Sequence, residues 1–112
     1  MTEFIEGDSF RDRHNANIAQ VMVAHVFGVD VQDLCARERS TARAALARQI
    51  AMYLSHVVLN MSFAQIGTAF GRDRSTACHA LRHVENMRDD PELDRTLLQL
   101  EVLLRQTVGA AV

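Results

Sequence analysis

Hydrophobic positions recur at helical spacing in two neighbouring stretches, residues 62–71 and 73–87, which a short turn joins. The first stretch opens with Ser62 and carries Gln65 three residues later, which is the spacing of a capping box at a helix start. Gly71 is placed to end this helix, because glycine tolerates the left-handed conformation that often follows one. Asp73 is placed to cap the next helix with its carboxylate. The pattern therefore predicts two short helices joined by a tight turn, as in a helix-turn-helix.

The rest of the chain has the same helical periodicity. A short turn of helix after Asp30 carries Val31 and Leu34. Three longer helices are predicted, from Asn15 or Asn17 to about Phe27, from Ser40 or Thr41 to about Leu59, and from Pro91 past Leu104. A hydrophobic content of 48% with a single proline fits a packed helical domain rather than a disordered chain. We therefore expect an all-α fold.

The two ends of the chain depart from this packed pattern. Residues 1–14 are acidic with scattered apolar side chains, so we expect a flexible tail, the alternative being a segment that folds on a partner. The last helix carries a leucine stripe, which comprises Leu93, Leu97, Leu100 and Leu104 and is widened by Leu98 and Val102. Leu103 lies off that face. This helix either closes the core or also binds a partner or a second copy. The domain is predicted to span residues 15–108, with a short tail at 109–112.

Charge is distributed unevenly along the chain. The net charge is -2, yet residues 33–88 carry eight Arg against four Asp or Glu, and the flanking segments are both acidic. A basic middle suits a surface that faces DNA, although an ordinary solvated face explains it as well.

The sequence also indicates where the protein works. Its N-terminal residues lack the apolar core of a secretory signal, and no apolar run approaches the roughly 20 residues that span a membrane. Cys35 and Cys78 stand alone, as expected for buried free thiols in a reducing compartment. We therefore expect a cytoplasmic protein.

Patterns that carry catalysis or metal binding are missing from the sequence. Neither GxSxG nor HExxH occurs. His79 and His83 share a helix face, but two ligands fall short of the four that a structural zinc site takes. We expect no enzymatic activity, no cofactor and no metal.

The stretches described above resemble domain IV of the bacterial replication initiator DnaA, its C-terminal origin-binding domain. The resemblance runs from about residue 16 to residue 104 and rests on VAHVFGVDVQDL at 23–34, RERS at 37–40, ARQIAMYL at 47–54, SFAQIGTAFG at 62–71 and RDRSTACHALRHVE at 72–85. It implies a six-helix, Trp-repressor-like domain with a helix-turn-helix that binds DnaA-box sequences in duplex DNA. The chain has no lysine and no GxxxxGK[ST] loop, so we expect no ATPase activity.

The resemblance also implies a set of DNA-binding residues. Arg39, followed by Ser40, matches an arginine that enters the minor groove, and Arg48, beside Gln49, matches one that holds a phosphate. The remaining matches lie on the helix-turn-helix and contact bases or backbone: Arg72, Asp73 at a base edge, Arg74, Ser75, Thr76 at a thymine methyl, and His79.

This chain departs from the family pattern in four places. One of the two signature glycines before Arg72 is missing, and Arg74 replaces the signature histidine. One extra residue separates Arg39 from Arg48, and Thr41 replaces a second loop arginine.

Two functions follow as hypotheses. The first is a nucleoid-associated regulator of replication initiation that binds double-stranded DNA at DnaA-box-like sites. The second is a protein-interaction module that modulates full-length DnaA or its regulatory ATPase with little specific DNA binding.

Overall fold

Six α-helices and no strand are formed within the part of the chain that the computed structural model describes, residues 2–36 and 41–110, with side chains described for 10–36 and 41–109. The helices are α1 (Thr2–Phe27), α2 (Val31–Cys35), α3 (Ala42–Val57), α4 (Phe63–Phe70), α5 (Arg74–Met87) and α6 (Pro91–Ala110). None of the helices in these residues is long and apolar enough to cross a membrane. The all-α, six-helix prediction is therefore confirmed.

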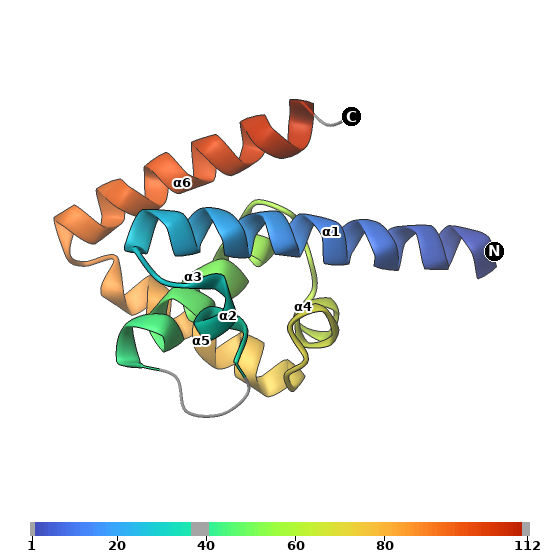
Figure 1. Ribbon diagram of the computed structural model, residues 1–112, viewed down its shortest axis with the longest axis horizontal. Coiled ribbons are helices and arrows are strands. Elements are labelled where there is room, and N and C mark those ends of the chain that lie inside the picture. The colour runs from blue at the N-terminus through green and yellow to red at the C-terminus, as the bar shows by residue number, and fades with distance from the viewer. Residues whose placement is uncertain (1, 37–40, 111–112) are drawn as a thin grey trace.

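Helix α3 lies at the centre of the domain and packs against α1 on one side and α5 on the other (Figure 1). Alanines at its buried positions, including Ala44, Ala47 and Ala51, let neighbouring backbones approach closely, while Ile50 and Leu54 fill the space between them. Its start is fixed by Thr41, whose hydroxyl accepts the amide of Ala44 at 3.0 Å. The predicted central helix is confirmed, although it ends at Val57 rather than near Leu59.

A second apolar cluster sits beneath the helix-turn-helix. Met52 of α3 meets Ile66 of α4, and Ala77 and Ala80 of α5 pack into the same group. This cluster seats α4 and α5 on α3, and it leaves the opposite side of α5 toward solvent. The helix-turn-helix is thus held by its own small core beside the main one.

Besides the end of α3, one predicted helix end differs from the structure, and the others are confirmed. Ser62 and Gln65 form the full capping box, and Gly71 ends α4 in the left-handed conformation with φ +66°. Helix α1, however, begins at Thr2, so the predicted start at Asn15 or Asn17 is wrong. An isolated acidic segment with few apolar residues gives no periodic signal, whereas a helix already formed extends by one hydrogen bond per added residue. The division into an acidic tail, a domain over 15–108 and a short C-terminal tail stays a prediction.

Helix α6 is tied to the rest of the domain through one guanidinium. Arg88, at the end of α5, donates to Asp94 at 2.5 Å, to Glu101 at 2.6 Å and to the hydroxyl of Tyr53 at 2.8 Å. Burial lowers the pKa of Arg88, but these three hydrogen bonds outweigh it and hold the pKa above its ordinary value. This network joins α3, α5 and α6 at one point.

Two expectations about side-chain burial are wrong. Leu97, Leu100 and Leu104 of α6 are buried as expected, but Leu98 and Val102 point outward with about half of each side chain exposed, 50% and 52%. One helix face can cover only one neighbour, and α6 lies at the edge of the domain (Figure 1). Neither cysteine is fully buried either: Cys78 is half-buried, and Cys35 is exposed and donates its thiol hydrogen to the side-chain oxygen of Gln20 at 2.8 Å.

We predict that Arg88→Ala lowers the free energy of unfolding by about 2–4 kcal/mol. It removes three hydrogen bonds from a charged donor, and among the described side chains it leaves the mostly buried Glu101 with Arg105, 4.0 Å away. Urea unfolding followed by circular dichroism measures the change. Arg95→Ala, at an exposed position of α6, is the matched control and should stay within about 0.5 kcal/mol of the parent. Equal effects from the two variants would show that the network does not stabilise the fold.

Candidate nucleic-acid interface

The turn between α4 and α5 is packed directly onto Gly67 of α4. A Cβ at this position would lie 2.8 Å from the carbonyl oxygen of Arg72 and 3.1 Å from the amide nitrogen of Arg74. The carbonyl of Gly67 also accepts the amide of Arg72 at 2.8 Å. The turn therefore rests on bare helix backbone, and this contact fixes where α5 begins.

Polar side chains cover the solvent side of the first turns of α5. Arg74, Ser75, Thr76 and His79 are all exposed, whereas Ala77 and Ala80 face the core. Asp73 stands at the N-cap position with extended backbone, but its side chain makes no capping hydrogen bond, so that part of the prediction is wrong. Its exposed carboxylate is consequently not engaged by the amides of α5.

Two arginines from distant parts of the sequence meet at the end of α2. Arg48 of α3 donates to the carbonyls of Leu34 at 2.8 Å and Ala36 at 3.2 Å, and Arg72 of the turn donates to the same Ala36 carbonyl at 2.6 Å. The carbonyl of Ala36 immediately precedes residues 37–40. The helix-turn-helix, the start of that loop and α3 are therefore joined at one place, along the lower edge of Figure 1.

The electrostatics of this place favour an anion. Burial lowers the pKa of Arg48, and the nearby positive charge of Arg72 lowers it further, with the Cys35 thiol opposing both. For Cys35, partial burial of the thiol raises its pKa, and the two arginines only partly counter it. A small hollow of about 140 Å³ opens here; it is lined by Asn17, Gln20, Leu34, Cys35, Arg48, Ala69, Phe70 and Arg72. Two adjacent guanidiniums repel each other, and a phosphate group beside them would relieve that repulsion.

One exposed arginine on α5 was not predicted from the sequence. Arg82 is exposed on the solvent side of α5, three residues beyond His79 and seven beyond Ser75. Residues at this spacing share a helix face. The helical periodicity that identifies the apolar stripe of α5 could therefore also have placed Arg82 on the same exposed face as Ser75 and His79.

Residues 16–84 match the family model described as the bacterial DnaA protein helix-turn-helix, which is more than half of the chain. The chain belongs to the bacterial DnaA helix-turn-helix family. Two solved structures agree in fold. A crystal structure of a DNA replication initiation factor superposes with a TM-score of 0.83 at 30% identity, covering 95% of this chain and 33% of that one. The replication initiator DnaA bound to AMPPCP and single-stranded DNA gives a TM-score of 0.80 at 29% identity, covering 95% of this chain and 32% of that one.

This chain therefore spans about a third of the length of the DnaA structures that it matches. The family model describes a helix-turn-helix, which is a DNA-binding motif. The matched region contains the turn, the exposed start of α5 and the two arginines at Ala36.

The sequence-predicted residues are only partly brought together. Arg39 and Ser40 lie outside the described residues. Arg48 and Arg72 contact one carbonyl, that of Ala36. Gln49 lies half-buried next to Arg48 on α3. The other five predicted residues are exposed on the turn and α5: Asp73, Arg74, Ser75, Thr76 and His79. Within the residues that have described side chains, no group of three or more His, Cys, Asp or Glu is placed to hold a metal.

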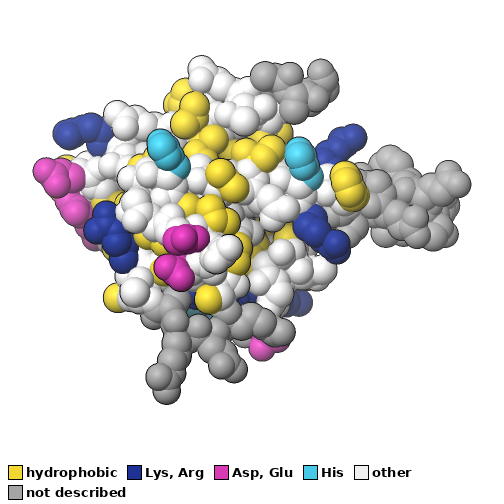
Figure 2. Space-filling model, viewed as in Figure 1, with side chains coloured by type: hydrophobic (Ala, Val, Ile, Leu, Met, Phe, Trp, Pro, Cys, Tyr) yellow, Lys and Arg dark blue, Asp and Glu magenta, His cyan; other side chains and the backbone are white. Residues whose placement is uncertain are grey.

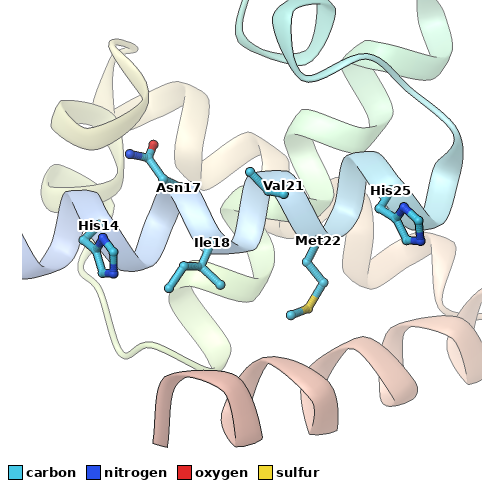
Figure 3. A pocket seen from close by; sticks show the side chains of 6 residues that line it. All are labelled: His14, Asn17, Ile18, Val21, Met22 and His25. Atoms are coloured by element: carbon cyan, nitrogen blue, oxygen red, sulfur yellow. The ribbon is translucent and has the colours of Figure 1, made fainter. Parts of the chain in front are cut away.

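A second, apolar surface covers another part of the domain. Figure 2 shows apolar side chains gathered on the face over α1 and the adjoining part of α6. On α1 they surround an open hollow of about 500 Å³, with a histidine near each end (Figure 3); it is lined by His14, Asn17, Ile18, Val21, Met22 and His25. On α6 the exposed apolar residues are Leu98, Val102 and Leu103.

We predict that Gly67→Ala destabilises the domain by about 1–3 kcal/mol, because the new Cβ meets backbone atoms of the turn that have to move. Alanine is otherwise favoured over glycine in helices by about 1 kcal/mol. Gly109→Ala in α6, where nothing lies within 4 Å of the added Cβ, is therefore the matched control and should be neutral or stabilising. Thermal unfolding of both variants measures the difference, and equal behaviour would show that the close approach at Gly67 does not constrain the turn.

Proposed function

We propose that this protein binds double-stranded DNA sequence-specifically at DnaA-box-like sites and regulates replication initiation without ATPase activity of its own. The observation that carries the proposal is the exposed polar start of α5 beside a pair of arginines that favours an anion. A helix-turn-helix uses the first turns of its second helix to contact base edges, while neighbouring basic groups hold the phosphates.

In the proposed complex the phosphate contacts come from α3 and the turn. Arg48 and Arg72 keep their hydrogen bonds to backbone carbonyls, and their two positive charges attract one phosphate, with Gln49 beside them. Arg39, followed by Ser40, enters the minor groove, as the resemblance implies.

Base contacts come from the start of α5. Asp73 accepts a hydrogen bond from a base edge, and Thr76 packs its methyl group against a thymine. Arg74, Ser75 and His79 complete the exposed surface that enters the major groove. Their exposure, together with the absence of a capping bond at Asp73, supports this assignment.

A second candidate function is favoured by the apolar surface on α1 and α6. Leu98, Val102 and Leu103 are each about half exposed on one helix, which is unusual for large apolar side chains. On this proposal the domain binds full-length DnaA or its regulatory ATPase through α6 and the hollow on α1. The exposed side of α6 would then lie at the opposite edge of the domain from the proposed DNA surface (Figure 1), whereas the α1 hollow shares Asn17 with the small hollow beside Arg48 and Arg72.

We predict that the parent protein prefers a labelled DnaA-box duplex over a scrambled duplex of the same length, and that its affinity for both falls as salt rises. Fluorescence anisotropy at two salt concentrations measures both effects. Weak and equal binding to the two duplexes would refute the sequence-specific proposal and leave only attraction to phosphates.

Arg39→Ala tests the loop contact in the same assay. We expect weaker binding and a salt slope reduced by about one, because one cationic contact is lost. Arg95→Ala removes the same charge from α6, away from the proposed DNA surface, and should leave affinity and slope unchanged. Identical losses in the two variants would mean that overall charge, not the mapped surface, governs binding.

The protein-interaction candidate predicts that Val102→Glu abolishes retention of full-length DnaA or its regulatory ATPase on the immobilised protein, since a charge on an apolar contact surface must be desolvated. Gln32→Glu adds the same charge at an exposed polar position of α2, outside this apolar surface, and should retain the partner. No retention by the unmodified protein would rule this candidate out.

A further inference from the structure

The arginines of the basic middle segment fall into two groups. Four of those with described side chains make hydrogen bonds within the fold. Arg43 donates to the carbonyl of Phe27 at 2.7 Å, and Arg48 and Arg72 donate to carbonyls at the end of α2. Arg88 bonds to α6. Within the described part of the chain, Arg74 and Arg82 make no hydrogen bond or ion pair. Both extend from α5 into solvent.

Arg74 differs from Arg82 in how firmly its backbone is held. It is the first residue of α5, and its amide nitrogen lies 3.1 Å from the point where a Cβ on Gly67 would be. The carbonyl of the preceding Asp73 accepts the amides of Thr76 at 3.0 Å and Ala77 at 3.3 Å, which sets the first turn. A long, flexible side chain therefore starts from a fixed point at the tip of the helix that enters the groove.

We infer that Arg74 recognises a guanine in the major groove and makes it a required base of this protein's DNA site. The inference rests on the proposed DNA binding, since it names the base that the start of α5 selects. Arg74 stands where the family signature has a histidine, so the selected base is a property of this chain.

The chemistry of the guanidinium decides which base fits. Arginine is always charged, offers only N–H donors, and presents two of them in a planar fork. Guanine displays two acceptors, N7 and O6, at the spacing of that fork, whereas adenine displays N7 beside an N6 donor that opposes a guanidinium. A histidine at the same position offers at most one donor toward the groove from each ring nitrogen and cannot form the paired contact.

Asp73 adds to the selection of a G·C pair. Its carboxylate makes no capping bond and is exposed next to Arg74. A carboxylate accepts from the N4 amino group of cytosine, which a G·C pair presents beside the guanine acceptors. The pair Asp73–Arg74 therefore offers an acceptor and a donor fork side by side.

The test compares duplexes in which each guanine of the DnaA box is replaced in turn by 7-deazaguanine, which keeps base pairing but lacks the N7 acceptor. For the parent we expect one replacement to weaken binding by about five- to a hundredfold. For Arg74→Ala the same replacement should have no further effect, because the partner of N7 is already gone. Arg74→His should lose the preference for guanine over adenine at that position.

Arg82→Ala is the matched control, an exposed arginine on the same helix that likewise has no partner in the described residues. We expect it to weaken binding to all duplexes alike and to keep the sensitivity to 7-deazaguanine. Circular dichroism confirms that each variant is folded. A parent that prefers the box, with Arg74→Ala and Arg74→His keeping its full base preference, overturns this inference and leaves the proposed function standing. A parent that distinguishes no duplex overturns both.

Discussion

The bare backbone of Gly67 lets the turn between α4 and α5 rest directly on α4, and the rest of the proposed DNA surface depends on this contact. The carbonyl of Arg72 would lie only 2.8 Å from an added Cβ, so any larger residue displaces the turn. The same turn aims Arg72 at the Ala36 carbonyl and sets the amide of Arg74 at the first position of α5. A family signature with a second glycine is shortened here to Gly71 alone, and close packing on Gly67 holds the remaining turn.

Arginines serve two different purposes in this domain. Four of them each donate at least one hydrogen bond within the fold and join segments that are distant in sequence: Arg43, Arg48, Arg72 and Arg88. Guanidinium groups suit this use because five donors allow one side chain to bind a carbonyl and still face a phosphate. Among the described arginines of the middle segment, Arg48 and Arg72 lie at the Ala36 carbonyl, and Arg74 and Arg82 lie exposed on α5, beside the proposed DNA surface.

Helix α6 adds an exposed apolar surface to the domain. Arg88 anchors it to α3 and α5, and its inner leucines close the main core, yet its outer side exposes Leu98 and Val102. The proposed DNA surface lies along the opposite edge of the domain (Figure 1). A domain with two separate surfaces can bind DNA on one and a protein on the other, which keeps both proposed functions compatible with a single fold.

The sequence by itself determined the helix-turn-helix, the central helix and the family, because capping boxes, glycine stops and apolar periodicity are local signals that survive without tertiary context. It also located the turn and α5 as the candidate site. The tertiary structure alone decided that Arg48 and Arg72 share the Ala36 carbonyl, that Asp73 makes no cap, and that Leu98 and Val102 point outward. It also showed α1 starting at Thr2 and added Arg82 to the exposed face of α5. These outcomes depend on which faces of neighbouring helices pack together and on which hydrogen-bond partner each polar group finds. The spacing of residues along one helix determines neither of these.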